Sequence, residues 1–194
     1  MWGSFFPNAM FAAAGKITDM NDMTEHRTSV LFICLGNICR SPLAEGVFRN
    51  ALAERGLEDA FEIDSAGLGD WHVGQPPDPR SIAVAERHGI DISGQVCRQV
   101  CPQDFVRFDL VFGMDRENVR RLRLLAPEEA SARIHLFLHY ALGRPEDVPD
   151  PFFEGEESFL AVYRMIREAS EALAARLADR VGSVRSNGQA SSIT

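Results

Sequence analysis

A cysteine and an arginine six positions apart lie in a segment that could bind and attack a phosphoryl group. Residues 34–41 follow the apolar run 30–33 and precede a stretch with helical spacing, which predicts a loop between a buried strand and a helix. The amides of such a loop can converge on one anion, and the helix adds its orphan N–H groups and the positive end of its dipole. That dipole and Arg40 both stabilise a thiolate, so Cys34 is the candidate nucleophile.

The other residues of this segment suit the same chemistry. Arg40 offers a planar, permanently charged guanidinium that can hold two oxygens of a phosphoryl group. Gly36 permits a close backbone approach, and Pro42 suits the start of a helix. Ser41 can donate a hydrogen bond to the thiolate. The predicted anion-binding loop is completed by Leu35, Asn37, Ile38 and Cys39.

An acid is the second chemical requirement, and Asp150 is the candidate. It precedes Pro151 in a segment rich in proline and acidic residues, which is typical of a loop. The proline restricts Asp150 to an extended backbone. When a cysteine attacks phosphorus, the leaving oxygen needs a proton, and a placed aspartate can supply it and later activate the hydrolytic water.

The elements that must position these residues alternate between strand and helix patterns. Strands are predicted at 29–33, 61–65, 108–112 and 133–137. Helices are predicted from about Pro42 to before Gly56, and at 79–88, 115–125 and 156–181. This order favours an α/β domain with a parallel sheet. Such sheets bind ligands beyond the carboxyl ends of their strands, which is where Cys34 is predicted to lie.

Composition narrows the class of protein further. The formal net charge of -8 argues against a nucleic-acid binder, and no apolar run approaches the length of a membrane span. Four cysteines, two of them in the predicted loop, indicate a reducing compartment, with the cytoplasm as the default. The five histidines show no metal-ligand spacing with the cysteines, so neither a metal nor another cofactor is predicted.

One domain, residues 28–181, is predicted. Residues 1–27 are interpreted as a flexible N-terminal extension. The alternatives are a weak partner-binding arm, or sequence that lies upstream of a true start at Met20 or Met23. A signal peptide is not expected there, because no basic stretch precedes the apolar residues. Residues 182–194 are predicted to be a disordered tail from their Ser, Asn, Gly and Gln content.

Residues 34–42 resemble the phosphate-binding loop of the low-molecular-weight protein tyrosine phosphatases. Further segments follow in that family's order, and the resemblance covers roughly residues 28 to 181. It implies a single three-layer domain in which helices flank a four-stranded parallel sheet. It also implies a protein tyrosine phosphatase that forms a phosphocysteine with Cys34 as nucleophile, Arg40 as phosphate ligand and Asp150 as general acid and base. The segments that carry it are 64–67, 74–78, 87–90, 98–99, 104–105, 108–109, 114–115 and 150–153.

The same resemblance assigns supporting residues. Trp71, in a glycine-rich loop, is expected to form one wall for a substrate ring, and Phe152 or Phe153 the other. Family members often carry tyrosines after the Asp-Pro pair, so control by phosphorylation there is not expected in this chain.

The resemblance also assigns residues around the loop. Asn37 and Ser65 are expected to brace it, and His88 is expected to pair with Asp115. Cys39 is expected to capture an oxidised Cys34 as a reversible disulfide.

Three alternative functions stay open. A phosphoarginine-directed branch of the family carries threonine where this chain has Ile38, which favours phosphotyrosine. Thiol-dependent arsenate reduction would need relay cysteines, but Cys97 and Cys101 precede the expected position and are interpreted as incidental loop cysteines. A module that binds phosphoproteins without turnover is disfavoured because Cys34, Arg40 and Asp150 are intact.

A tyrosine-phosphorylated protein, such as a bacterial tyrosine autokinase, is the expected partner. Neither nucleic acid nor a membrane is expected to bind, and the chain is expected to be a monomer or a weak dimer.

Overall fold

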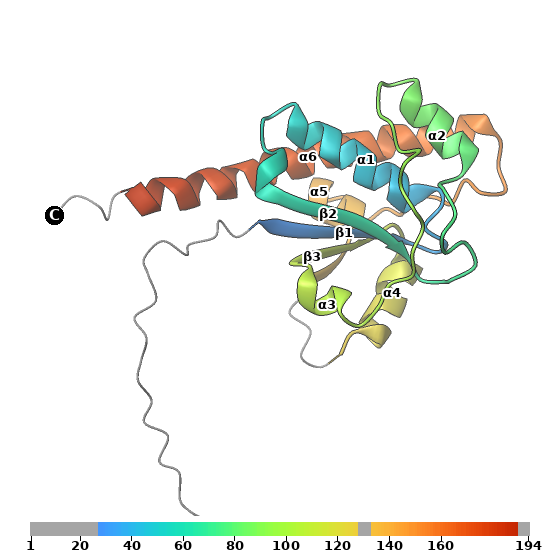
Figure 1. The fold of residues 1–194 in the computed structure, drawn as a ribbon, viewed down its shortest axis with the longest axis horizontal. Coiled ribbons are helices and arrows are strands. Elements are labelled where there is room, and N and C mark those ends of the chain that lie inside the picture. The colour runs from blue at the N-terminus through green and yellow to red at the C-terminus, as the bar shows by residue number, and fades with distance from the viewer. Residues whose placement is uncertain (1–26, 128–132, 190–194) are drawn as a thin grey trace, which may run out of the picture.

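The structure, a computed structural model, describes residues 27–127 and 133–189. At its centre is a four-stranded sheet in the order β2-β1-β3-β4, in which every paired strand is parallel (Figure 1). The predicted fold class is confirmed, and each predicted strand is present with shifts at its ends. The strands are β1 (Thr28–Cys34), β2 (Phe61–Gly67), β3 (Leu110–Gly113) and β4 (Arg133–Leu136).

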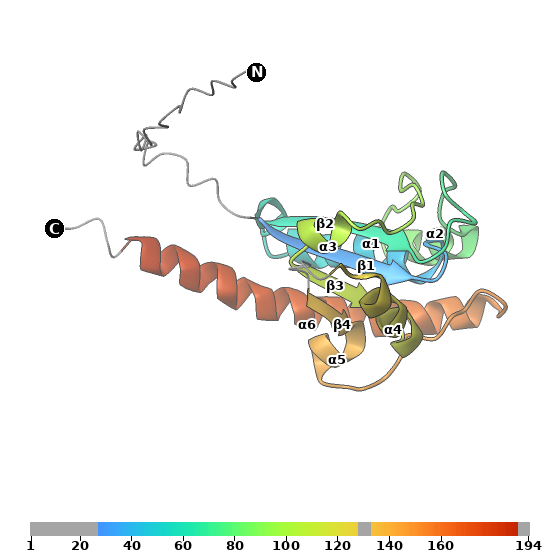
Figure 2. The same ribbon diagram turned by 90° about the horizontal axis from the view of Figure 1, so that it is seen from below.

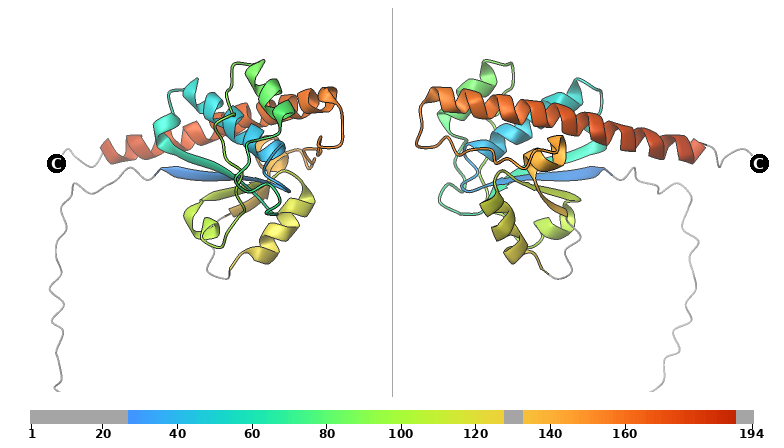
Figure 3. Two further views of the ribbon diagram at one scale, coloured as in Figure 1. Left: turned by 45° about the vertical axis from the view of Figure 1, so that its right-hand side comes forward. Right: turned by 180° about the vertical axis from the view of Figure 1, so that it is seen from behind.

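Helices cover both faces of this sheet (Figures 2 and 3). Two short helices, α3 and α5, and one 3-10 turn were not predicted from the sequence. The helices are α1 (Arg40–Ala53), α2 (Pro79–Glu86), α3 (Asp104–Arg107), α4 (Arg116–Leu125), α5 (Phe137–Leu142) and α6 (Glu156–Gln189), and the 3-10 turn is Glu58–Ala60.

Strand β1 is buried on both faces, which explains why its sequence is a continuous apolar run. Val30 and Phe32 belong to the larger core cluster, to which α1, α5 and α6 contribute. Leu31 and Ile33 belong to a second cluster on the opposite face, with residues of α3 and α4. The two cores fix the carboxyl end of β1, and Cys34 is the last residue of that strand.

Helix α1 begins two residues earlier than Pro42, at Arg40. Pro42 therefore sits in the first turn, where a missing N–H costs no intrahelical bond. The helix ends at Ala53, and Gly56 follows with φ 63, a left-handed conformation that glycine adopts without strain.

The last helix differs most from its prediction. Helix α6 was expected to end at residue 181 but continues to Gln189, so residues 182–189 of the predicted disordered tail are helical. Residues 190–194 and residues 1–26 of the predicted extension lie outside the described residues. No helix within 27–127 or 133–189 is both long enough and apolar enough to cross a membrane.

Candidate active site

The thiol of Cys34 lies at the carboxyl end of β1, at the start of the loop that leads into α1. Its side chain is buried, and the hydroxyl of Ser41 donates to its Sγ at 3.1 Å. Cys39 occupies the N-cap position of α1 and makes no side-chain capping bond among the described residues. The first turn of α1 therefore keeps its positive dipole end uncapped next to the thiol.

Asn37 holds the loop in its bent shape. Its φ of 56 is in the left-handed region, which costs free energy for a residue other than glycine. The side chain donates from Nδ2 to Ser41 Oγ and Ser65 Oγ, both at 3.0 Å, and its Oδ1 accepts from the Arg98 amide at 2.9 Å. The Asn37 carbonyl accepts from the thiol of Cys97 at 2.7 Å. These four hydrogen bonds stabilise the strained residue.

Glu45 extends this network and was missed by the sequence analysis. Ser65, on β2, donates to Glu45 Oε2 at 2.8 Å, and Arg49 donates to Glu45 Oε1 from Nε and Nη2. Burial raises the pKa of Glu45, against the opposing effects of Ser65 and Arg49. The available signal was the spacing, because Glu45 lies one helical turn after Ser41 on the side that faces the core.

The guanidinium of Arg40 is buried and meets two carboxylates. Nη1 donates to Asp115 Oδ2 at 2.7 Å and to the Val148 carbonyl at 3.1 Å, while Nη2 donates to Asp150 Oδ2 at 2.6 Å. Burial alone lowers the pKa of Arg40, but Cys34, Asp150 and Asp115 together raise it above its ordinary value. Nε is a buried donor with no hydrogen-bond partner among the described residues.

Asp150 is brought to this guanidinium by the loop that precedes α6. Its side chain is 42% exposed, so it faces solvent as well as Arg40. Arg80, on α2, anchors the segment that follows by donating to the carbonyls of Phe152 and Glu154. Asp115 is less exposed than Asp150. Its Oδ1 accepts from the Asn118 amide at 2.6 Å, which caps the start of α4.

The expected substrate walls are exposed aromatic rings. Trp71 is 63% exposed, and its ring occupies the space that a side chain on Gly69 would need. The Gly69 amide donates to the carbonyl of Leu35, which ties this segment to the loop. Phe152 and Phe153 pack edge to face with ring centroids 4.9 Å apart, and Phe153 is almost fully exposed. Ile38 is partly buried against the larger core, beneath the loop.

His88 does not pair with Asp115, so that expectation is wrong. Its Nδ1 lies 2.8 Å from the Val84 carbonyl, and its ring stacks on Tyr163 with centroids 4.0 Å apart. The partners of Asp115 are Arg40 and Asn118 instead. His88 lies two residues after the end of α2, and its ring packs on Tyr163 of α6.

The three other cysteines differ in their surroundings. Burial, Asp78 and Cys34 raise the pKa of Cys39, and burial and Cys34 raise that of Cys97 to about 11. Cys97 is buried against Asn37, so it is part of the loop's support rather than an incidental cysteine, whereas Cys101 is exposed. In the described ranges no group of three His, Cys, Asp or Glu side chains could hold a metal ion.

Comparison with known proteins agrees with this geometry. A family model for low molecular weight phosphotyrosine protein phosphatase matches residues 29–183. The chain is 43% identical over 150 residues to the low molecular weight protein-tyrosine-phosphatase YfkJ of Bacillus subtilis, covering 77% of this chain and 95% of YfkJ.

Two solved structures are also similar. A protein tyrosine phosphatase from Entamoeba histolytica, crystallised with Hepes in its active site, superposes with a TM-score of 0.74 at 34% identity, covering 78% of this chain and 97% of that one. A Drosophila arginine phosphatase has a TM-score of 0.71 at 35% identity, covering 76% and 96%. This chain belongs to the low molecular weight phosphotyrosine protein phosphatase family. It is an enzyme of the protein-tyrosine-phosphatase class.

Proposed function

We propose that Cys34, Arg40 and Asp150 carry out phosphotyrosine hydrolysis in two steps through a phosphocysteine. The observation that carries this assignment is the guanidinium of Arg40, which meets the acid directly and is buried at the end of the loop that begins at the thiol. The uncapped first turn of α1 and the partnerless Arg40 Nε supply donors for the phosphoryl oxygens.

In the first step the Cys34 thiolate attacks phosphorus. The S–P bond forms as the bond from phosphorus to the phenolic oxygen breaks, and Asp150 gives its proton to that oxygen. In the second step a water oxygen attacks phosphorus, Asp150 takes a proton from that water, and the S–P bond breaks. Ser41, which donates to Sγ at 3.1 Å, stabilises the thiolate as it leaves.

Substrate selection follows from the walls of the site. Trp71 and the pair Phe152 and Phe153 offer exposed aromatic faces on which the phenyl ring of phosphotyrosine can stack. The similarity to an arginine phosphatase keeps phosphoarginine as a second candidate substrate, and Ile38 in place of threonine favours phosphotyrosine. The partner is a tyrosine-phosphorylated protein, for which a bacterial tyrosine autokinase is a candidate.

The setting of the enzyme is a further part of the proposal. Four unpaired cysteines suit a reducing compartment, so we place the enzyme in the cytoplasm, as a monomer or weak dimer. Cys39 would capture the sulfenic acid of a peroxide-oxidised Cys34 by forming a disulfide with loss of water, which stops further oxidation.

A substrate panel tests the proposed function. Phosphotyrosine, phosphoserine and phosphoarginine peptides are incubated with wild type and Cys34→Ser, with EDTA and a reductant present. Turnover of phosphotyrosine alone, lost in the variant, supports the proposal. Preferential turnover of phosphoarginine would reassign the substrate, and turnover by Cys34→Ser would remove Cys34 from the nucleophile role. If no peptide turns over, arsenate reduction and binding without turnover become the functions to assay.

A further inference from the structure

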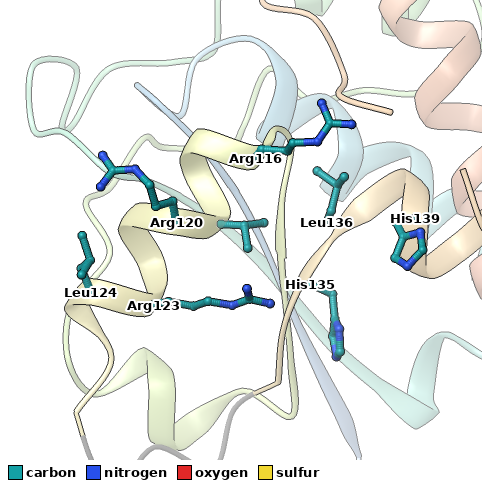
Figure 4. Close-up of a pocket in the computed structure, with 8 residues that line it drawn as sticks. Arg116, Arg120, Arg123, Leu124, His135, Leu136 and His139 are labelled. Atoms are coloured by element: carbon teal, nitrogen blue, oxygen red, sulfur yellow. The ribbon is translucent and has the colours of Figure 1, made fainter. Parts of the chain in front are cut away.

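A basic groove runs along α4 (Figure 4). Its volume is about 500 Å³. Figure 4 shows arginines of α4 on one side and histidines of β4 and α5 on the other, with Arg123 pointing toward β4 and Arg120 pointing away from it. The groove is lined by Arg116, Val119, Arg120, Arg123, Leu124, His135, Leu136 and His139.

The charge of this face is opposite to that of the whole chain. Helix α4 carries four arginines and one glutamate within ten residues, whereas the chain as a whole has a net charge of -8. Glu117 pairs with Arg120 and Asp147 pairs with Arg116. Arg123 contacts the Ile134 carbonyl at 3.3 Å and has no carboxylate partner among the described residues. Among the described residues, Arg123 therefore keeps a positive charge in the groove that no carboxylate compensates, which favours an anionic ligand.

The groove and the active site meet at Asp115 and Arg116. Arg116 directly follows Asp115, whose carboxylate holds Arg40, and the Arg116 amide donates to Asp147 Oδ1 at 3.2 Å. The segment from Asp147 to Asp150 thus borders both sites. Helix α4 is about 15 Å long, the span of about five residues of extended peptide. The length of the groove thus matches a short extended peptide that starts near the Cys34 loop.

We propose that this groove binds an acidic stretch of the phosphoprotein substrate, within about five residues of the phosphotyrosine. Carboxylates of that stretch would pair with Arg120 and Arg123 and accept hydrogen bonds from the imidazole of His139. Leu124, 73% exposed at the far end, would contact an apolar side chain. This inference rests on the binding of phosphotyrosine in the proposed function, and not on its turnover, because it places the acidic stretch relative to the phosphorylated residue.

The test compares matched phosphotyrosine peptides with four Asp and Glu residues, or the corresponding Asn and Gln, on either the amino or the carboxyl side. The enzymes are wild type, the double variant Arg120→Gln and Arg123→Gln, and the control Arg167→Gln. Arg167 is an exposed arginine of α6, on the opposite face of the sheet. Phenyl phosphate, which cannot reach the groove, reports the chemical step, and circular dichroism reports folding.

For wild type and Arg167→Gln, we expect one of the two acidic peptides to have a kcat/KM about three- to tenfold higher than its neutral counterpart. This is the range expected of two exposed ion pairs. The double variant should lose that preference while its rate on phenyl phosphate stays unchanged. The preference should also fall as salt rises, since exposed charges are screened over about 10 Å at 0.1 M ionic strength. Equal kcat/KM for acidic and neutral peptides, or a preference that survives in the double variant, would overturn the inference.

A binding assay separates this inference from the proposed function. The same peptides are titrated into Cys34→Ser, with and without the two arginine substitutions. If turnover of every substrate is absent but acidic peptides still bind more tightly through Arg120 and Arg123, the proposed function fails and the groove assignment stands. If phenyl phosphate turns over but neither assay shows an acidic preference, the groove assignment alone fails. A dimer that dissociates in the double variant, measured by sedimentation, would instead assign the groove to a second copy and overturn the inference.

Discussion

Asp150 and Arg40, 110 residues apart in the chain, form an ion pair in which Oδ2 and Nη2 lie 2.6 Å apart. The pair holds the proposed acid against the proposed phosphate ligand. A phosphoryl group that binds the guanidinium through both Nε and Nη2 competes with the Asp150 carboxylate for Nη2. Binding of the substrate would therefore free Asp150 to turn toward the leaving oxygen, which couples substrate binding to the position of the acid.

Removing the proposed general acid, Asp150, should slow hydrolysis most for substrates whose leaving oxygen must be protonated as it departs. Asp150→Ala is expected to lose roughly 10²–10⁴-fold in kcat with phenyl phosphate, and much less with p-nitrophenyl phosphate, whose phenolate leaves unaided. Steady-state rates over a series of aryl phosphates measure this. A loss of the same size for every leaving group would show that Asp150 only positions Arg40.

Removing the hydroxyl of Ser41 should slow the second step more than the first. In Ser41→Ala the Cys34 sulfur loses the donor at 3.1 Å that stabilises the departing thiolate. A single hydrogen bond to a charged group is worth about 1.5–3 kcal/mol, so phosphocysteine breakdown should slow by about ten- to 150-fold. Stopped-flow with p-nitrophenyl phosphate should then show a burst of nitrophenol. Unchanged kcat without a burst would place Ser41 outside the reaction.

The carboxylate of Glu45 sets the direction of the network behind the loop. Because Ser65 donates its only proton to Glu45, the Ser65 oxygen must accept a hydrogen bond from Asn37 Nδ2. The second proton of Nδ2 is donated to Ser41. Glu45→Gln introduces an NH₂ group that competes with this arrangement. We expect a loss of about 1 kcal/mol in the free energy of unfolding and a several-fold fall in kcat. The exposed Glu86→Gln is the matched control, and an equal, small effect of both substitutions in urea unfolding and kinetics would contradict this role.

Residue spacing predicted the chemistry that is local, whereas the family resemblance supported distant residues such as Asp150 and Ser65 and missed Glu45. Cys34, Arg40 and Ser41 lie within eight consecutive residues that join β1 to α1, so their spacing indicated that they are neighbours. Glu45 acts only through Ser65, which β2 brings alongside β1, and no pattern within α1 specifies that partner. His88 was assigned to Asp115 by resemblance, but the ring of Tyr163 on α6 gives it a different partner.

The same distinction explains which elements of the fold were predicted correctly from the sequence and which were not. Strand β1 and the amphipathic part of α6 follow directly from apolar periodicity. Helix α5 follows β4 without a break, and its apolar residues therefore look like a continuation of that strand. The polar residues 182–189 contain nothing that forbids a helix, and α6 continues through them.

Buried thiols should give the protein a distinct response to alkaline pH. The pKa of Cys97 is raised from 9.0 to about 11, so the folded state holds this proton more tightly than the unfolded state does. Its contribution to the free energy of unfolding is therefore complete below pH 9 and is lost as the pH rises toward 11. Urea unfolding between pH 8 and 11 should show this fall, and it should be smaller in Cys97→Ala. Iodoacetamide at pH 8 should label the exposed Cys101 but not Cys97, and rapid labelling of Cys97 in the folded protein would contradict the assignment.

The central claim is that the phosphoryl group passes through the sulfur of Cys34. Wild type and Ser41→Ala would be mixed with a phosphotyrosine peptide, quenched within milliseconds and analysed by mass spectrometry after digestion. The account predicts a phosphate adduct on the thiol of Cys34, more abundant in Ser41→Ala and absent from Cys34→Ser. Turnover at the normal rate without any adduct on Cys34, or an adduct on another residue, would contradict it.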